Sequence, residues 1–394
     1  YYDLIKDVAI PYEIGTTQKG YFQYSSDEDW IKVTPNENSV FEMNFTNKEG
    51  YNVPIVLIHK YDEKKNDIDT IYSSMDLNTV AAETELKGKN PFYIGLKKGE
   101  TYFFRISDAL FRPSFDPYEF KLSPAFSNAN DAYEENDTFN TAKSISTDPI
   151  KGSLSSIGDI DTFYFKPDKT AVYSAIVQPD PLPEEYSKAH DELKQPLDST
   201  LLIYEDTNGN GKLEEDEEGN LRIVEYAYEN QPEIGSFRAE NGRGYFFKIL
   251  NFYKMVTTLS PYTFTIKEAP EIDEDAESVM KNNIPSKPVT LVSSNGEYTQ
   301  SGYINMTEGK GDTDYYKFIQ KENIKRTIKL EVPFDLDGIV TVYDSKGTQI
   351  AKSDYYDKAD YEILQTALKK GTYYIKVEEL NGNASALPYK LTVK

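Results

Sequence analysis

The sequence predicts an all-β protein made of three tandem β-sandwich domains with a jelly-roll-like fold. Three observations support this prediction: an alternating closing strand occurs three times, the same order of markers precedes each copy, and strand-forming residues dominate the apolar stretches. A chain of 394 residues has room for two to four domains of roughly 100–200 residues each. The predicted domains comprise residues 1–125, 126–269 and 270–394.

The closing strand is the most regular repeat. Its strict alternation of apolar and polar residues predicts a strand that buries one face in a core. A glycine turn and an aromatic strand precede each copy, because glycine fits a tight turn and aromatic side chains fit a pleated sheet. The three copies are residues 117–122 (PYEFKL), 261–266 (PYTFTI) and 388–393 (PYKLTV).

An acidic pair precedes the first long strand of each repeat. Two carboxylates stand one residue apart just before an apolar run, so both side chains point to the same face of a strand. This pattern is typical of a cation site at the start of a strand, and equally of an acidic turn. The copies are residues 158–165 (GDIDTFYF), 311–318 (GDTDYYKF) and, more loosely, 27–33 (DEDWIKV).

Polar stretches separate the three repeats. Residues 127–131 and 268–271 are the predicted linkers between domains. Residues 184–194 lie between two prolines inside the second repeat, and we predict a short surface helix or an irregular flap there.

Composition limits the classes of partner. The net charge of -23 and the pI near 4.6 disfavour nucleic acid and anionic membrane surfaces, but they suit calcium, which takes oxygen ligands. Without cysteine, the chain forms no disulfide and has no thiolate zinc site or cysteine nucleophile. No apolar run approaches the ~20 residues that span a bilayer, so we expect no membrane insertion. The chain opens on Tyr1 without a signal-peptide pattern, which we interpret as a mature fragment.

Residues 206–217 (DTNGNGKLEEDE) fit the twelve-residue calcium loop of EF-hands. The candidate ligands at positions 1, 3, 5, 7, 9 and 12 are Asp206, Asn208, Asn210, Lys212 through its backbone carbonyl, Glu214 and Glu217. Both flanks are predicted strands, so the loop replaces a hairpin turn. The alternative is an acidic hairpin with an Asn-Gly turn, which leaves the spacing of Glu217 unexplained.

The second repeat opens with residues 133–138 (YEENDT), then reaches 152–154 (GSL) and 158–161 (GDID). This order resembles the bacterial pre-peptidase C-terminal (PPC) domain and the related collagen-binding domains of bacterial collagenases. The third repeat matches less fully, because residues 274–278 (EDAES) replace the opening motif, and the first repeat lacks that motif. The resemblance implies β-sandwiches beside catalytic domains of secreted peptidases, and hence an extracellular bacterial protein associated with the cell surface.

The resemblance also implies calcium ligands. In the collagen-binding relatives, calcium lies between the acidic opening segment and the acidic pair. The implied ligands are Glu134, Asn136, Asp137, Asp159 and Asp161 in the second domain, and Glu274, Glu277, Asp312 and Asp314 in the third. The alternative is that these side chains cap turns and remain solvated.

Catalytic residues are not predicted. His59 and His190 fall in different predicted domains, and no Gly-x-Ser-x-Gly motif is present. We expect a non-catalytic, calcium-stabilised binding and spacer array of a secreted bacterial protein, either accessory to an extracellular peptidase or adhering to a polymer. The alternatives are a structural surface or matrix component, and an accessory part of an extracellular hydrolase with an unseen carboxylate site.

The expected partner is a collagen-like or cell-wall polymer or protein, or a linked peptidase. Tyr355, Tyr356 and Tyr361 stand among charged residues in a segment too polar to be wholly core. Tyrosine is enriched at recognition surfaces, so these three are the predicted ligand-binding residues. The alternative is that Tyr355 or Tyr356 points inward and the others are ordinary surface residues.

Overall fold

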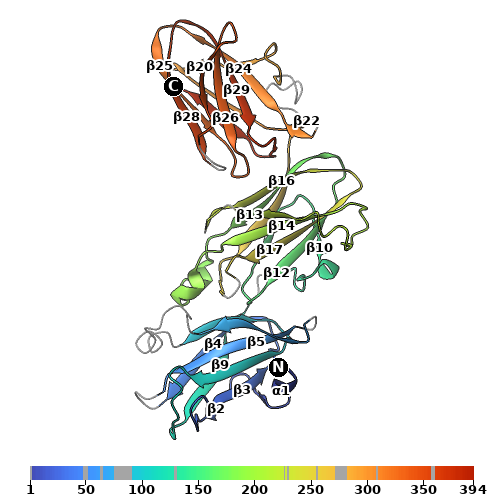
Figure 1. Ribbon diagram of the computed structural model, residues 1–394, viewed down its shortest axis with the longest axis vertical. Helices are drawn as coiled ribbons and strands as arrows, with labels where there is room; N and C mark the ends of the chain where they lie inside the picture. The colour runs from blue at the N-terminus through green and yellow to red at the C-terminus, as the bar shows by residue number, and fades with distance from the viewer. Residues whose placement is uncertain are drawn as a thin grey trace.

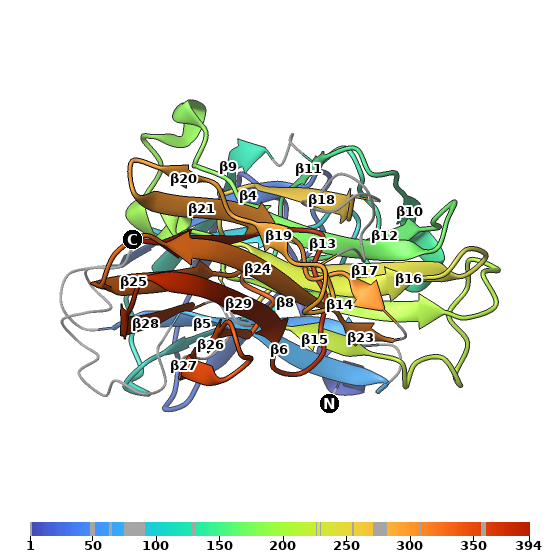
Figure 2. The same cartoon turned by 90° about the horizontal axis from the view of Figure 1, so that it is seen from above.

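The computed structural model describes residues 2–47, 52–62, 65–74, 91–127, 131–225, 227–228, 230–253, 256–270, 282–307, 309–355 and 360–394. Over these residues the regular secondary structure is almost entirely β-strand, as predicted. Three pairs of sheets follow one another along the long axis of the molecule, and they overlie one another when viewed from above (Figures 1 and 2). We call these pairs the first, second and third sandwich.

The first sandwich follows the short helix α1 (Tyr2–Ile5). Its sheets have the strand orders β1-β3-β8-β5-β6 and β2-β9-β4-β7, and Phe104 on one sheet packs edge-on against Phe120 on the other. The strands are β1 (Ile10–Pro11), β2 (Thr17–Gly20), β3 (Glu28–Val33), β4 (Ser39–Asn47), β5 (Pro54–Asp62), β6 (Asp67–Ser73), β7 (Phe92–Leu96), β8 (Tyr102–Asp108) and β9 (Tyr118–Ser127).

The second sandwich repeats this arrangement. Its sheets have the orders β10-β12-β17-β14-β15 and β11-β18-β13-β16, and Phe163 stacks on Phe264 between them. A 3₁₀ turn, η1 (Phe139–Thr141), precedes them. The strands are β10 (Lys143–Ser144), β11 (Ile150–Gly152), β12 (Ile160–Phe165), β13 (Ala171–Pro179), β14 (Ser199–Asp206), β15 (Arg222–Val224), β16 (Glu233–Ala239), β17 (Gly244–Asn251) and β18 (Tyr262–Glu268).

The third sandwich has two five-stranded sheets, in the orders β19-β24-β29-β26-β27 and β20-β21-β30-β25-β28. A short ribbon of β22 (Met306–Thr307) and β23 (Lys310–Gly311) stands beside them. The strands of the two sheets are β19 (Val289–Thr290), β20 (Ser293–Ser294), β21 (Glu297–Gly302), β24 (Thr313–Gln320), β25 (Ile324–Glu331), β26 (Gly338–Asp344), β27 (Gln349–Ser353), β28 (Tyr361–Leu368), β29 (Gly371–Glu379) and β30 (Tyr389–Val393).

The closing-strand tyrosine explains two features of the repeat. In every sandwich its ring is buried against a glycine on the paired strand. Glycine is required at that position because a Cβ atom there would overlap the tyrosine side chain. Its hydroxyl donates a hydrogen bond to the second carboxylate of the acidic pair. The Gly–Tyr–Asp sets are Gly20–Tyr118–Asp29, Gly152–Tyr262–Asp161 and Gly302–Tyr389–Asp314.

The first two sandwiches meet through an edge strand and an insertion. Strand β7 contributes Gly95, whose carbonyl accepts a hydrogen bond from Ile157 N (3.0 Å) in the second sandwich. The insertion between β13 and β14 contains two 3₁₀ turns, η2 (Glu184–Tyr186) and η3 (Asp191–Lys194).

The insertion differs from the prediction of a surface helix or flap. It packs its apolar side against the first sandwich: Leu193 is 1% exposed, and His190 stacks on Tyr93 at 5.5 Å between ring centroids. The segment is therefore part of the contact between the sandwiches.

A buried polar network joins the second and third sandwiches. The Asp335 carboxylate, 1% exposed, accepts hydrogen bonds from the hydroxyls of Ser236 and Ser385. Ser174 accepts a further bond from the backbone N–H of Ala386 (2.9 Å). Because the four side chains come from both sandwiches, the network constrains how the two are oriented.

Candidate functional site

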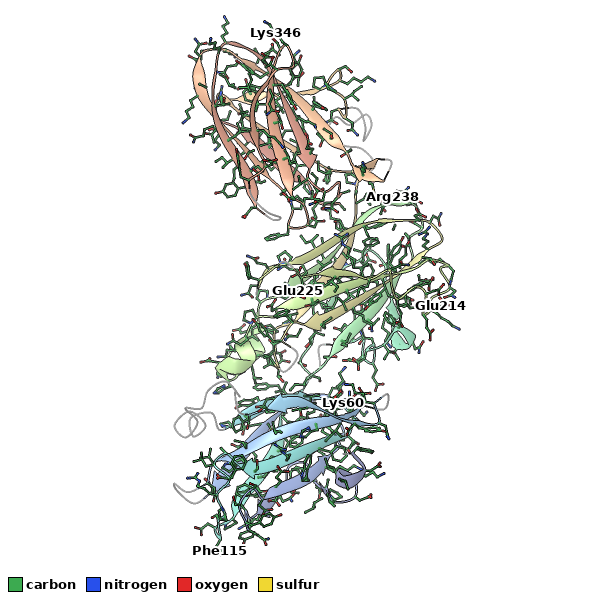
Figure 3. All side chains as sticks on the ribbon, viewed as in Figure 1. Lys60, Phe115, Glu214, Glu225, Arg238 and Lys346 are labelled. Carbon is green, nitrogen blue, oxygen red and sulfur yellow. The ribbon has the colours of Figure 1, made fainter. Side chains whose placement is uncertain are left out.

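The loop at residues 206–217, which we call the loop site, joins β14 and β15 as predicted. These strands pair antiparallel, with Ile203 opposite Arg222, and the loop replaces the hairpin turn between them. Gly211 adopts a φ of 79°, in the left-handed region that favours glycine, at the loop position where the sharp turn is expected. Figure 3 shows the labelled Glu214 at the edge of the second sandwich.

Asp206 anchors the loop site. Its side chain is fully buried, and one carboxylate oxygen accepts hydrogen bonds from Tyr164 Oη (2.9 Å) and Gly211 N (2.8 Å). The other oxygen accepts one from Gly209 N (2.7 Å). A buried carboxylate at this place therefore shapes the loop backbone, and it lies near two further acids.

Three carboxylates converge in the loop site. One ligand oxygen from each of Asp206, Glu214 and Glu217 lies within 4.8 Å of the others. Glu217 is 3% exposed and accepts hydrogen bonds from both the backbone N–H (2.8 Å) and the hydroxyl (2.6 Å) of Thr207. Burial acts to raise the pKa of Glu217, but the bonds from Thr207 and Glu214 outweigh it and lower that pKa to about 2. Glu217 is thus ionised at neutral pH.

The amides of the loop site face the acids. Asn208 and Asn210 donate hydrogen bonds from their side chains to Glu214 (3.2 and 2.7 Å), and Lys212 donates its backbone N–H to Asn210 Oδ1 (2.8 Å). Each amide also carries an oxygen, so these side chains can offer calcium ligands of the kind the spacing predicts. The oxygen-rich loop fits calcium.

A second group of acids lies where the second sandwich meets the first. Two triads each place their carboxylate oxygens within 4.8 Å: one is Asp131, Glu134 and Asp161, and the other is Glu134, Asp137 and Asp159. We call these five residues, with Asn136, the acidic cluster. The structure therefore brings together all five residues that the resemblance implied, and it adds Asp131, which the sequence reasoning missed.

Lys97 of the first sandwich enters the acidic cluster. Its ammonium is 2.6 Å from Asp159 Oδ1 and 3.5 Å from Glu134 Oε1, and it also pairs with Asp137. The lysine side chain is only 8% exposed. No signal in the sequence indicates this contact, because Lys97 belongs to a different repeat. The ammonium supplies positive charge at the place where calcium was expected.

Burial dominates the titration of the acidic cluster. It raises the pKa of Asp159 to about 8, although the Lys97 ammonium acts to lower it. Burial and the charges of Asp131 and Asp159 raise the pKa of Asp161 well above its usual value. Burial also acts to lower the pKa of Lys97, but the surrounding acids prevail and raise it. The cluster therefore gathers more carboxyl groups than one ammonium can balance, and burial keeps Asp159 and Asp161 in their neutral form at pH 7.

Asn136 is a further sign of a cation site. It is fully buried, and its side-chain oxygen accepts no hydrogen bond from any residue within the described ranges. Its amide N–H group instead lies near Asp161 and lowers the pKa of that carboxyl. A buried amide oxygen beside several carboxylates is a donor set that fits calcium.

A hollow of about 160 Å³ adjoins the acidic cluster. Asp159, Ser156 and Asn251 supply its polar lining, while Leu154, Ile160, Leu250 and Val256 supply its apolar lining. An acid with a raised pKa in a hollow is a feature that hydrolase sites share. The other polar side chains that line this hollow, Ser156 and Asn251, offer neither an imidazole nor a thiol.

The acidic pair of the third sandwich has protein donors. Asp312 accepts hydrogen bonds from Asn305 N (2.9 Å) and Asn283 Nδ2 (3.2 Å), and Asp314 accepts one from Tyr389. In the described part of the chain neither acid joins a metal-sized group of carboxylates. The predicted ligands Glu274 and Glu277 lie outside the described residues.

The predicted ligand-binding tyrosines lie on the third sandwich. Tyr355 is 81% exposed, so it points outward rather than into the core. Tyr361 is 47% exposed, and Lys329 Nζ lies 4.4 Å from the centre of its ring. Tyr356 lies outside the described residues.

No protein-family model matches the chain. No curated protein sequence matches it either. Among solved structures, the chain is similar to the pre-peptidase C-terminal domain of a collagenase from Bacillus anthracis, at 16% identity and a TM-score of 0.22 over 27% of this chain and 92% of that one.

Two further solved structures are similar to the chain. One is PliG, a periplasmic inhibitor of g-type lysozyme from Aeromonas hydrophila, at 20% identity and a TM-score of 0.21 over 27% of this chain and 94% of that one. The other is the tandem CBM51 modules of a family 98 glycoside hydrolase from Streptococcus pneumoniae, at 11% identity and a TM-score of 0.18 over 62% and 83%. These similarities do not assign the chain to a family. Within the described residues, no helix is long and apolar enough to cross a membrane.

Proposed function

We propose that the chain is a non-catalytic, calcium-stabilised binding and spacer array of a secreted bacterial protein, accessory to an extracellular peptidase or adhering to a surface polymer. The loop site carries this proposal, because a complete twelve-position sequence match coincides with three converging carboxylates. The proposed units are residues 1–125, 126–269 and 270–394, each a member of the PPC family that the sequence resembles.

Calcium at the loop site would have a structural effect. Asp206, Glu214 and Glu217 would hold it through carboxylate oxygens, with Asn208, Asn210 and the Lys212 carbonyl completing the shell. Binding to the folded form alone stabilises it by about 2.7 kcal/mol when free calcium is a hundred times the dissociation constant. The array would then be more rigid in calcium-rich surroundings.

A second calcium ion is proposed for the acidic cluster. Five carboxyl groups converge there around the single Lys97 ammonium, and a bound cation would favour their ionised form, which supports this proposal, as does the oxygen of Asn136. The third sandwich is a weaker candidate, because Asp312 and Asp314 already accept hydrogen bonds from protein groups.

Calorimetric titration of the whole, metal-free chain with calcium tests the proposal. Glu217→Gln keeps the size of the side chain but removes its charge, and it should abolish one binding event. Asp216→Asn is the matched control, since Asp216 is an exposed neighbour outside the six ligand positions. Magnesium should bind far more weakly, because it demands a tighter octahedral shell. Equal calcium uptake by wild type and Glu217→Gln would refute the assignment.

One observation favours the alternative of a hydrolase part: Asp159 has a raised pKa and lines a hollow beside other acids. Turnover of peptide and glycoside substrates by the whole chain tests this alternative. Turnover by the wild type that is lost in Asp159→Asn would favour the hydrolase alternative over the non-catalytic array. No turnover, together with calcium binding, would support the array.

A further inference from the structure

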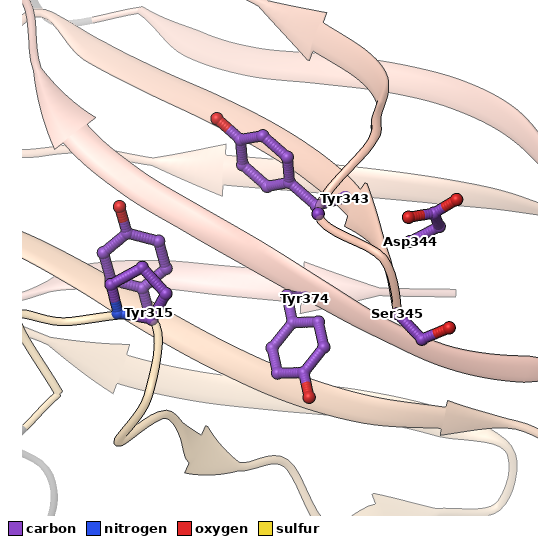
Figure 4. A pocket seen from close by; sticks show the side chains of 7 residues that line it. Tyr315, Tyr343, Asp344, Ser345 and Tyr374 are labelled. Carbon is purple, nitrogen blue, oxygen red and sulfur yellow. The ribbon is translucent and has the colours of Figure 1, made fainter.

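The outer face of the third sandwich carries a hollow of about 360 Å³, which we call the tyrosine pocket. Tyr315, Tyr343 and Tyr374 line it from the neighbouring strands β24, β26 and β29 (Figure 4). Pro285 forms one side, and the turn that begins at Asp344 forms another. All three tyrosine rings are half-buried, so their faces remain accessible to a ligand.

The second sandwich has the same positions in its own sheet. Tyr343 stands opposite Tyr374 in register, just as Tyr204 stands opposite Phe246. Tyr315 pairs across the strands with Lys376, as Thr162 pairs with Lys248 in the second sandwich. The floor of the pocket therefore exists twice in the chain.

The two copies differ in what covers this floor. The backbone carbonyl of Asn136 accepts a hydrogen bond from Thr162 N, and the backbone carbonyl of Asn282 accepts one from Tyr315 N, both at 2.9 Å. Residues three positions after these asparagines are therefore equivalent: Phe139 in the second sandwich and Pro285 in the third.

Phe139 fills the position over the floor of the second sandwich. Its ring packs edge-on against Tyr204 and Phe246, with centroids 5.0 and 5.3 Å away, and Lys248 Nζ lies 3.8 Å from its centre. Pro285 is smaller and exposed, and it leaves the tyrosines of the third sandwich open. The tyrosine pocket thus has room for one six-membered ring.

The floor also changes its chemistry between the two copies. Tyr315 stands where the second sandwich has Thr162, and Tyr374 stands where it has Phe246, so the third sandwich has two additional aromatic hydroxyls. Lys376 forms an ion pair with Glu378, and its charge acts on Tyr315. An occupant that matches this lining needs an apolar face for the rings and hydroxyl groups at its edge for the polar groups. A pyranose has both, since its C–H groups form an apolar face and its hydroxyls stand around the rim.

We propose that the tyrosine pocket binds a pyranose ring of a neutral polysaccharide. A neutral polymer is favoured because the net charge of -23 and the nearby Asp344 and Glu378 repel polyanions. This site is separate from Tyr355 and Tyr361 and from both candidate calcium sites. It requires no metal.

Native electrophoresis in gels containing soluble glucan, xylan, mannan or glycol chitin tests the proposal on the whole chain. At least one polysaccharide should retard the wild-type protein. Tyr343→Ala should weaken binding about tenfold or more, as loss of a central aromatic contact does. Pro285→Phe should have the same effect by supplying the ring that closes the second sandwich, while every tyrosine stays in place. Tyr228→Ala, on an exposed tyrosine of the second sandwich outside the pocket, should bind as wild type does.

Each outcome decides the question. No retardation of the wild type by any neutral polysaccharide would overturn the proposal, and so would unchanged retardation of a folded Pro285→Phe variant. Displacement by N-acetyl-phenylalanine amide, but not by free hexoses, would indicate a partner protein's aromatic side chain instead. A normal calcium isotherm for Pro285→Phe would separate this site from the calcium sites.

Discussion

The hydroxyl of Tyr262 donates a hydrogen bond to the fully buried carboxylate of Asp161. The same bond links Tyr118 to Asp29 at 2.6 Å in the first sandwich. This repeated contact gives the second acid of each pair a role in the fold that does not depend on a metal.

Tyr262→Phe should destabilise the second sandwich by about 1–3 kcal/mol, because it leaves a buried carboxyl group without its hydrogen-bond donor. Hydrogen exchange of the β18 amides measures this locally, which matters in a chain of several cooperative units. Tyr355→Phe is the control, since Tyr355 is exposed. Equal protection of β18 in both variants would contradict the prediction.

Gly152→Ala should also destabilise the second sandwich, by about 1–3 kcal/mol, because the new methyl group would overlap the side chain of Tyr262. Gly219→Ala is the matched control: a Cβ atom there would meet nothing within 4 Å. Differential scanning calorimetry compares the two. A midpoint for Gly152→Ala equal to that of the control would show that the tyrosine shifts at little cost.

Lys97→Met should make the second sandwich more dependent on calcium. Without calcium the acidic cluster loses its only buried ammonium among the described contacts, and breaking a buried pair costs about 3–5 kcal/mol. The variant also lacks the ammonium that competes with calcium for these acids, so calcium should raise its melting temperature more than it raises that of wild type. Lys98→Met, at the exposed neighbouring residue, is the control. The same calcium-induced rise in both variants would argue against an ion in the cluster.

Asp335→Ala should loosen the contact between the second and third sandwiches. The hydroxyls of Ser236 and Ser385 would lose their shared acceptor in a buried place. Small-angle X-ray scattering should then show a larger maximum dimension or a broader distance distribution. Glu331→Ala, which removes a half-exposed pair with Lys329, should leave the profile unchanged.

His59 should make the first sandwich sensitive to acid. Burial lowers its pKa from 6.5 to about 4, and the charge of Arg105 adds to this effect. The neutral imidazole therefore stabilises the fold above about pH 6.5, and this stabilisation is lost as the pH falls towards 4. Between pH 7 and pH 4.5, the urea midpoint should fall less in His59→Gln than in wild type.

Trp30 fluorescence follows this transition, because the chain has one tryptophan and its ring lies 5.3 Å from that of His59. Parallel loss of stability in both proteins would show that carboxyl groups alone cause the acid sensitivity.

Local patterns predicted much of this structure. Alternation in the closing strand predicted a buried strand, and Tyr118, Tyr262 and Tyr389 are indeed buried. The spacing from Asp206 to Glu217 predicted a loop whose acids converge. These features lie within about a dozen residues, where spacing and periodicity determine which side chains share a face.

Sequence patterns did not predict the contacts between repeats. Lys97 meets the acidic cluster because of how two sandwiches are oriented, and neither of their sequences records that orientation. Leu193 is buried for the same reason, although its short, mostly polar segment predicted a place on the surface. The exchange of Phe139 for Pro285 became meaningful only when strand register showed that the two positions are equivalent.

The origin of the Lys97 ammonium in the preceding sandwich has a consequence for biosynthesis. Domains generally fold as units during synthesis, the N-terminal one first. Strand β7 would therefore be in place, with Lys97 at its end, before Asp159 and Asp161 leave the ribosome. The nascent acids would meet a countercharge as soon as they come together, so closure of the second sandwich would not have to wait for an ion.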